Sequence, residues 1–434
     1  MKKCLLLLSS VLFLLPAIAH AQGAQEARLG YVNLGTGWQP WNAIQIGGTA
    51  PGYALEGVRL YCQSGSTIAP CNPAAGAPVN AALMPHLIAC TAKVKINAGS
   101  CRVNAIGDST TFGEFSTGPA NTGDLVSGSY PARLSQYLNS AILPSQHDSF
   151  MGAGQSSAGN SALFNDARIV STGWTGASVT TGGNLFTAAS TANLAFTPTG
   201  QVNQFTLWWA VVGANNGTFS WAVDAGTPTN ITENGTNGVF STVIPAGTLG
   251  THVLHLNWVS GVVFFVGVEA VNTAVGSVNI ISAGNPGASS TAWNNATAAW
   301  SPIPAVVAQA PDVILLDLGI NDWLQSVPVA TFTSNMQTLI NAWKANSDIV
   351  LITPAPSSIP DAPLAKQQQY VAATYALAAA NNLPIVDNFG RWGSFELKNP
   401  APYLFYGNHL HPNANGYSDF AQSIAAQLLS VVGH

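Results

Sequence analysis

Short, almost entirely apolar runs alternate with longer amphipathic segments in the C-terminal part of the chain. Strands are expected at 277–282, 313–318, 349–353 and 385–387, and helices at about 290–309, 330–345, 363–381 and 416–431. Strands that are apolar on both faces must be covered on both, as in parallel sheets of α/β proteins. The pattern therefore predicts a parallel sheet flanked by helices, and a strand at 103–106 with a following helix adds to it.

A different pattern occupies 161–275, inside the α/β pattern. Runs such as Gln204–Val212, Thr218–Val223 and Val262–Val268 are rich in β-branched and aromatic residues, and Gly, Asn and Thr turns separate them. This predicts an all-β, jelly-roll-like sandwich inserted into the α/β domain. The α/β domain would then consist of two parts, 101–160 and 276–434.

Residues 1–21 have the features of a secretory signal peptide. Two lysines precede an apolar run from Leu5 to Ala19, and a small-x-small cleavage motif ends at Ala21. A membrane anchor is the weaker interpretation, because the run is shorter than the ~18 to 20 residues that a span needs. We therefore expect a secreted or periplasmic protein with no membrane span after cleavage.

Four cysteines remain after residue 21, an even number in a chain that we expect to be exported. Disulfides are favoured in an oxidising compartment. Three connectivities are open, and the simplest pairs Cys62 with Cys71 and Cys90 with Cys101. A zinc site is less favoured, because the spacings differ from the tight Cys-x-x-Cys pairs of zinc knuckles. We predict that 22–100 is a small β-rich, disulfide-containing N-terminal region.

Charged residues make up only 7% of the chain, and its net charge is −5. Neither sign is clustered, so the sequence offers no basic patch for nucleic acid. Hydrophobic residues reach 47%, which is enough to build packed cores despite the low charge.

Polar or glycine-rich segments follow three of the predicted strands. They are Gly107-Asp108-Ser109, the turn Ala283–Gly287 and Asn321-Asp322, and a fourth segment, Asn408-His409-Leu410-His411-Pro412, precedes the last helix. The carboxyl ends of parallel strands meet at one edge of a sheet, where active sites of such folds lie. We therefore expect these segments to converge, with His411 folding back over that edge.

In this order the four segments resemble the SGNH (GDSL) hydrolases, a family of esterases and lipases. The resemblance covers about 100–155 and 276–432 and implies an SGNH hydrolase-like, flavodoxin-like fold. It implies that Ser109 is the nucleophile and His411 its general base. It also implies that the backbone N–H groups of Ser109 and Gly287 and the side-chain amide of Asn321 bind the oxyanion. Gly284 competes for the glycine role, although the family spacing favours Gly287.

One position departs from the family, which usually has Asp three residues before the catalytic His. Here that residue is Asn408, which can fix the imidazole tautomer but carries no charge to stabilise imidazolium. Three arrangements stay open: a Ser-His-Asn triad, a Ser-His dyad oriented by a backbone carbonyl, or a carboxylate from elsewhere, such as Asp387.

Simpler interpretations apply to several of these residues. Ser109 could be only a helix N-cap, and Asp322 could tie down its own loop through hydrogen bonds to the backbone. His409 is a bystander in the family pattern, which places the base directly before Pro412. His409 and His411 could supply two metal ligands, but the sequence shows no third, so we expect neither a metal nor another cofactor.

The inserted module lies between the nucleophile segment and the glycine segment, which would set it beside the active-site edge. Its aromatic residues are expected to be mainly core, although one or two exposed rings could stack on sugars; they are Trp208, Trp209, Trp221, Trp258, Phe264 and Phe265. Modules placed this way occur in SGNH-type carbohydrate esterases, including some that deacetylate cell-wall polysaccharide.

From this resemblance we expect a secreted serine esterase whose substrate is an ester, with an O-acetylated glycan favoured. Two alternatives remain. One is a glycan O-acetyltransferase using the same residues, and the other is a glycan-binding protein whose hydrolase domain has lost its activity.

Overall fold

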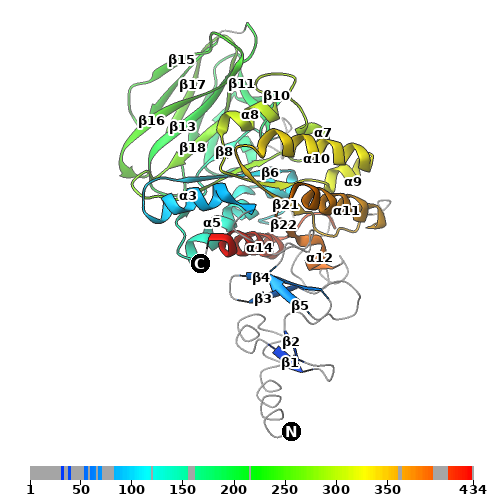
Figure 1. Ribbon diagram of the computed structural model, residues 1–434. Coiled ribbons are helices and arrows are strands. Elements are labelled where there is room, and N and C mark those ends of the chain that lie inside the picture. The colour runs from blue at the N-terminus through cyan, green and yellow to red at the C-terminus, as the bar shows by residue number, and fades with distance from the viewer. Residues whose placement is uncertain are drawn as a thin grey trace.

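A parallel sheet of six strands forms the centre of the computed structural model (Figure 1). The model describes residues 83–118, 121–154, 162–214, 217–359, 364–393 and 409–432, and the backbone of five short strands before residue 71. In spatial order the sheet strands are β22 (Ile385–Asp387), β21 (Asp348–Thr353), β20 (Val313–Asp317), β6 (Cys101–Gly107), β19 (Val278–Gly284) and β7 (Ser145–Gln146). All neighbouring pairs are parallel, which confirms the predicted α/β fold.

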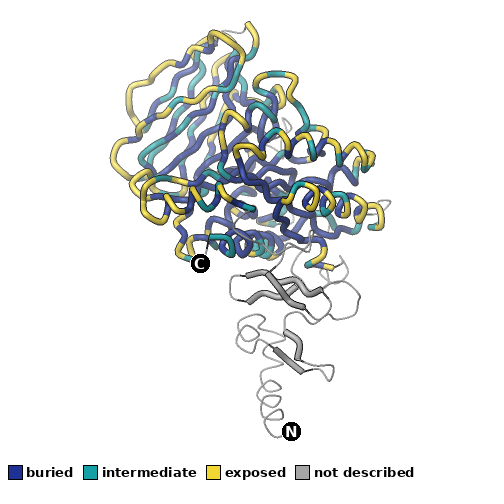
Figure 2. The backbone as a smooth tube through the Cα atoms, viewed as in Figure 1, coloured by how far each residue is buried: buried dark blue, intermediate teal, exposed yellow. Residues whose placement is uncertain are grey.

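Helices cover both faces of this sheet. One face packs on α3 (Pro85–Lys95), α5 (Tyr130–Ser140) and α14 (Ala414–Val432), and the other on α8 (Pro302–Gln309), α10 (Val329–Trp343) and α11 (Leu364–Asn381). Successive strand residues alternate between the two cores: Val313 and Leu315 face the first, while Ile314 and Leu316 face the second. Because both faces are covered, β19, β20, β21 and β22 are buried throughout, and β6 is buried except at Arg102 (Figure 2).

Shorter helices occupy the loops, and one of them differs from the sequence prediction. They are α4 (Ser109–Phe112), η3 (Val126–Gly128), α6 (Ala162–Asn165), α7 (Ser290–Trp293), α9 (Ile320–Leu324) and α12 (Asn388–Trp392). The single helix predicted at about 290–309 is wrong, because α7 ends before Asn294 and α8 begins again at Pro302. Proline suits the first helical position, because an N–H there would have no acceptor within the helix and proline has none.

The N-terminal region contributes short strands and one helix. The strands are β1 (Tyr31–Asn33), β2 (Trp38–Pro40), β3 (Tyr53–Glu56), β4 (Arg59–Ser64) and β5 (Thr67–Pro70). Helix α3 lies within the 22–100 span that we predicted to be β-rich, but its Leu87 and Val94 are buried in the core of the α/β domain. The structure contains the disulfide Cys90–Cys101, which joins α3 to β6. The predicted signal peptide and Cys71 lie outside the described residues, and so does the side chain of Cys62.

Two antiparallel sheets form the inserted module, as predicted (Figure 1). The first contains β10 (Thr175–Thr180), β11 (Gly183–Ala188), β18 (Val263–Val271), β13 (Val202–Val211) and β16 (Gly238–Gly250), and β8 (Phe150–Met151) pairs with β18. The second contains β15 (Thr229–Thr232), β14 (Thr218–Val223), β17 (Leu254–Ser260), β12 (Asn193–Phe196) and β9 (Ile169–Thr172). Phenylalanines such as Phe205, Phe219 and Phe265 fill the space between them.

The module packs tightly on the α/β domain. Strand β18 is buried along its whole length, because one face points into the sandwich and the other contributes Phe264 and Val266 to the core around α8. Across this junction Glu269 of β18 accepts hydrogen bonds from the guanidinium of Arg102 on β6 and from the indole of Trp208. Trp208, Phe264 and Phe265 are therefore buried, and Trp209, Trp221 and Trp258 pack partly buried against the sandwich core.

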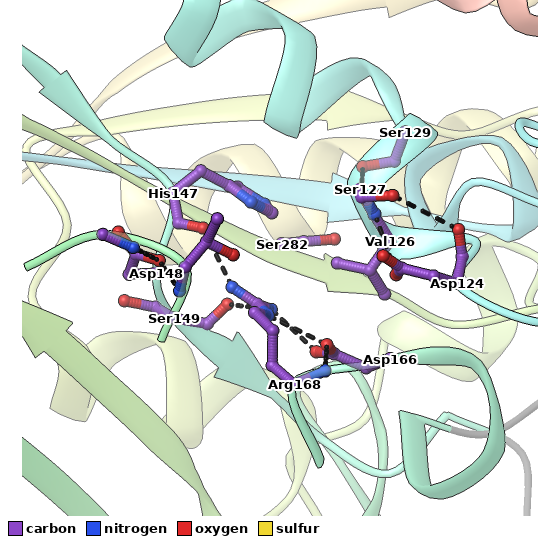
Figure 3. Close-up of polar contacts among 12 residues, drawn as sticks. Asp124, Val126, Ser127, Ser129, His147, Asp148, Ser149, Asp166, Arg168 and Ser282 are labelled. Carbon is purple, nitrogen blue, oxygen red and sulfur yellow. Dashed lines mark hydrogen bonds and ion pairs between the residues drawn. The ribbon is translucent and has the colours of Figure 1, made fainter. Parts of the chain in front are cut away.

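A second set of polar contacts fixes the chain where it passes from the sheet into the module (Figure 3). The Arg168 guanidinium donates to both carboxylate oxygens of Asp166 and to the carbonyls of His147 and Ser149. The Asp148 carboxylate accepts from two backbone N–H groups of the β12–β13 turn. These bonds join three separate stretches of chain at the domain junction.

The module also buries an acidic side chain. Glu233 is 0% exposed and accepts from the Phe264 N–H, while its other oxygen has no partner. Burial raises its pKa to about 9. The carboxyl is therefore protonated in the folded protein at neutral pH and ionised in the unfolded chain.

This difference predicts how stability depends on pH. Because the folded state holds a proton that the unfolded chain releases above its ordinary pKa of 4.5, the stability due to Glu233 is present below about pH 4.5 and is lost as pH rises through about 9. Glu233→Gln should flatten the fall of the melting temperature between about pH 6 and 9. Equal slopes for the variant and the native protein would contradict the assignment.

Candidate active site

Three loops at the carboxyl edge of the sheet bring the predicted site residues together. The last residues of three adjacent strands, Gly284, Gly107 and Asp317, are partners in register. The loops that follow carry Gly287, Ser109 and Asn321. The Asn285 N–H donates to the Gly107 carbonyl at 3.0 Å, which ties two of these loops together.

Ser109 begins α4 directly after β6. The N-cap of this helix is Asp108, whose Oδ1 accepts from the Thr110 N–H at 2.9 Å, so the capping role that we considered for Ser109 belongs to its neighbour. A Cβ at position 107 would lie 2.1 Å from Thr111 Oγ1 and 2.7 Å from the Asp317 carbonyl oxygen, so glycine lets α4 turn tightly off the strand. Ser109 is 5% exposed.

His411 reaches Ser109 from the other end of the chain. Its Nε2 lies 2.8 Å from Ser109 Oγ, a hydrogen-bond distance, and the residue is 6% exposed. The loop that carries His411 is held by the loop after β21, because the Ser358 N–H donates to the His409 carbonyl. Burial lowers the pKa of His411 to about 4, so the imidazole is neutral at pH 7 and able to accept a proton.

Glu114 is a site residue that the sequence analysis missed. Its Oε2 lies 3.3 Å from His411 Nε2, and burial raises its pKa to about 7. The neighbouring Phe115 ring stacks on the imidazole with a centroid distance of 5.2 Å. An acidic residue five positions after the nucleophile, in a chain with so few charges, is the signal that could have drawn attention to it.

The two candidate glycines occupy different positions. Gly284 is the last residue of β19, where an added Cβ would lie 2.2 Å from the Phe112 backbone nitrogen. Gly287 lies in the loop beyond the strand with φ +76°, and its carbonyl accepts from the Gln325 side chain. Gly284 therefore serves the close packing of β19 on α4, and Gly287 lies in the loop beyond it.

Asn321 and Asp322 lie at the start of α9 and differ in what they contact. The Asn321 Nδ2 donates to the Ala288 carbonyl at 3.1 Å, which leaves its second amide hydrogen for another acceptor. Asp322 accepts from the N–H and the hydroxyl of Ser290 at 2.9 and 2.6 Å. Asp322 thus has a structural role, but it ties α9 to α7 and does not act only within its own loop as we considered.

The residue that orients His411 is not among these contacts. Asn408 lies outside the described residues. Asp387, the alternative carboxylate, caps α12 by accepting from the Gly390 N–H, and it also accepts from the Thr353 hydroxyl. These two bonds give Asp387 a structural role beside any other that it has.

Further buried carboxyls lie behind Ser109. Burial raises the pKa of Asp108 to about 7 and that of Asp317 well above its ordinary value, and the neighbouring Asp108 adds to the rise at Asp317. One oxygen of Asp317 is buried without a hydrogen-bond partner. A protonated Asp317 relieves the cost of burying that oxygen as a charge.

The site is distinct from a hollow of about 490 Å³ at the domain junction, between α5 and the module. Arg168 and Asp148 line this hollow (Figure 3), whereas Ser109, His411, Gly287 and Asn321 do not.

Among the described residues no His, Asp or Glu side chains gather around Ser109 in a metal-binding cluster. None of the described helices combines the length and apolar composition that a membrane span requires.

Comparisons with known proteins agree with this geometry. Residues 267–418 match the GDSL-like lipase/acylhydrolase family. A solved peptidoglycan O-acetylesterase shares the fold with a TM-score of 0.61 and 16% identity, over 81% of this chain and 97% of that one. No curated protein matches the sequence.

Two further solved structures match with low scores. A lipase/acylhydrolase from Enterococcus faecalis has 24% identity and a TM-score of 0.29, over 34% of this chain and 74% of that one. A family two carbohydrate esterase from Cellvibrio japonicus has 13% identity and a TM-score of 0.28, over 65% and 97%.

A parallel α/β sheet with serine and histidine in contact at its carboxyl edge is the arrangement of a carboxylic ester hydrolase. The match to the GDSL-like lipase/acylhydrolase family covers residues 267–418, the second part of the α/β domain.

The contact at Gly284 generates a prediction. A methyl group there would collide with the backbone of α4, so Gly284→Ala should displace Ser109, lower esterase activity at least tenfold and destabilise the protein by about 1–3 kcal/mol. Gly118→Ala is the matched control, because nothing lies within 4 Å of its added Cβ. Activity assays and thermal melts of both variants test this, and a fully active Gly284→Ala protein would contradict it.

Proposed function

We propose that this protein is an exported serine esterase that removes O-acetyl groups from carbohydrate, with Ser109 as nucleophile and His411 as general base. The observation that carries the proposal is the 2.8 Å contact between Ser109 Oγ and His411 Nε2 in a buried site. A serine hydroxyl needs such a base, because it is a weak nucleophile by itself.

In the first half of the reaction Ser109 Oγ attacks the ester carbonyl carbon and its proton passes to His411 Nε2. The carbonyl oxygen becomes an oxyanion, for which the N–H groups of Ser109 and Gly287 and the Asn321 amide are the donors. Collapse of the intermediate expels the alcohol, which takes the proton from Nε2 and leaves an acyl-enzyme. Water then repeats the sequence, releasing the carboxylic acid and restoring Ser109.

The choice of carbohydrate rests on two kinds of support. One is that the solved peptidoglycan O-acetylesterase, which acts on an acetylated glycan, has the same fold over most of both chains. The signal-peptide pattern of 1–21 would bring the enzyme to the compartment where polysaccharides are exposed.

Release of acetate from a panel of acetylated polysaccharides tests the proposal, with acetylxylan and O-acetylated peptidoglycan as two members. We expect acetate from at least one glycan with native protein and none with Ser109→Ala. Hydrolysis of p-nitrophenyl acetate without release from any glycan would reject carbohydrate and keep the esterase. A sugar acceptor that gains the acetyl group would instead establish the transferase alternative.

Asn321→Ala tests the oxyanion role. Loss of one donor should lower kcat about a hundred- to a thousand-fold with little change in KM, because the amide acts on charge that develops only in the transition state. The melting temperature reports whether α9 is intact. A kcat within threefold of the native value would remove Asn321 from the mechanism.

Asn408→Asp tests the departure from the family pattern. If residue 408 orients His411, a carboxylate there should keep or raise kcat/KM for p-nitrophenyl acetate, because it adds charge that stabilises imidazolium. An inactive variant with a native melting temperature would count against that orienting role.

A further inference from the structure

We propose that Glu114 supplies the negative charge that stabilises the His411 imidazolium during acyl transfer, the charge that Asn408 lacks. This inference rests on the proposed function of Ser109 and His411. It makes Glu114 a positioning residue, which acts on the reaction through the imidazole.

The distances support this role. His411 Nε2 faces two oxygens, Ser109 Oγ at 2.8 Å and Glu114 Oε2 at 3.3 Å. The proton that leaves Ser109 therefore arrives at the nitrogen atom beside which the carboxylate lies. Opposite charges this close in a site shielded from water attract strongly, and Glu114 is only 7% exposed.

The backbone holds Glu114 in place from two elements. Its N–H donates to the Ser109 carbonyl at 3.0 Å, so it continues the turn that begins with the nucleophile. Its carbonyl accepts from the Tyr417 hydroxyl of α14 at 2.6 Å. Because α14 follows the His411 loop, the base and the carboxylate are fixed to the same two segments.

Phe115 restricts the imidazole from the side. Its ring lies nearly parallel to that of His411, with an interplanar angle of 21°. The residue has φ +63°, uncommon for a side chain of this size, and its N–H donates to the Asn121 side chain at 2.9 Å. The turn that forces Phe115 onto the imidazole also directs the Glu114 carboxyl to Nε2.

The proton balance shows when the charge matters. Ser109 loses its proton and becomes bonded to the acyl carbon, Nε2 gains that proton, and the leaving alcohol later removes it. Between these events the imidazolium lies beside the ionised Glu114 carboxylate, and the two opposite charges stabilise each other until the alcohol takes the proton. If Glu114 is protonated beforehand, the imidazolium forms without a counter-charge and the step is slower.

This requirement predicts the pH dependence. The pKa of Glu114, raised by burial to about 7, makes the carboxylate available above that pH and removes it below. Other titratable groups near it are His411, Asp108 on the turn before α4, and Tyr417 on α14, whose pKa lies well above 10 and which stays neutral. Asp108 also titrates near 7, so the experiment must separate it from Glu114.

The test is the profile of kcat/KM for p-nitrophenyl acetate between about pH 5 and 9. Native protein should lose activity as pH falls below about 7, although His411 stays neutral down to about 4. Glu114→Gln should lose this acid limb and be about 10- to 100-fold slower at pH 8, with the loss in kcat and not in KM. Adding Asn408→Asp to Glu114→Gln should restore part of the rate.

Glu233→Gln is the matched control, a buried glutamate in the module that should leave both rate and limb unchanged. A Glu114→Gln protein that keeps the rate and the limb would overturn the inference and assign the limb to another group, such as Asp108. The proposed function itself fails if native protein does not hydrolyse the ester. It also fails if hydrolysis is unchanged in Ser109→Ala.

A measurement on native protein covers the case in which Glu114→Gln does not fold. The ¹⁵N shift of His411 Nε2, followed by NMR, should change near pH 7 as Glu114 ionises beside it. A single inflection near pH 4 with none near 7 would overturn the inference.

Discussion

The hydrogen bond between Ser109 and His411 joins two segments that are 302 positions apart in the chain. Nothing local holds them together, so the contact depends on the parallel sheet, which sets the end of β6 beside the loops after β19 and β20. It also depends on α14, which packs on α5 and brings the His411 loop over the sheet edge. The inserted module of two β-sheets interrupts the sequence between β7 and β19, yet β19 still pairs with β6 and β7 in the parallel sheet.

Burial gives the site its chemical properties and also its cost. The same loss of water that keeps His411 neutral raises the pKa values of Asp108, Glu114 and Asp317. Such carboxyls weaken the folded state as they ionise, so a function is needed to explain why they are present. Asp322, another buried carboxyl of the site, has a structural function, because its bonds to Ser290 fix α9 to α7. For Glu114 the adjacent imidazole provides the explanation.

The sequence predicted those features that depend on periodicity and order along the chain. The parallel strands follow from apolar runs, and the meeting of the loops that carry Ser109 and Asn321 follows from the rule that parallel strands end at one edge. The break between α7 and α8 was missed, because apolar spacing continues across the Asn294–Ser301 loop. Glu114 was missed because its role depends on a tertiary contact with His411, which its position close to Ser109 in the sequence does not specify.

The central claim is that Ser109 is a nucleophile activated by His411. The most direct measurement is reaction with a fluorophosphonate followed by mass spectrometry of the peptide that contains Ser109, because the serine oxygen displaces fluoride only when a base accepts its proton. We expect one covalent adduct on Ser109 in native protein and labelling slowed at least a hundredfold in His411→Ala. Native protein that stays unlabelled, or a label on a different serine, would contradict it.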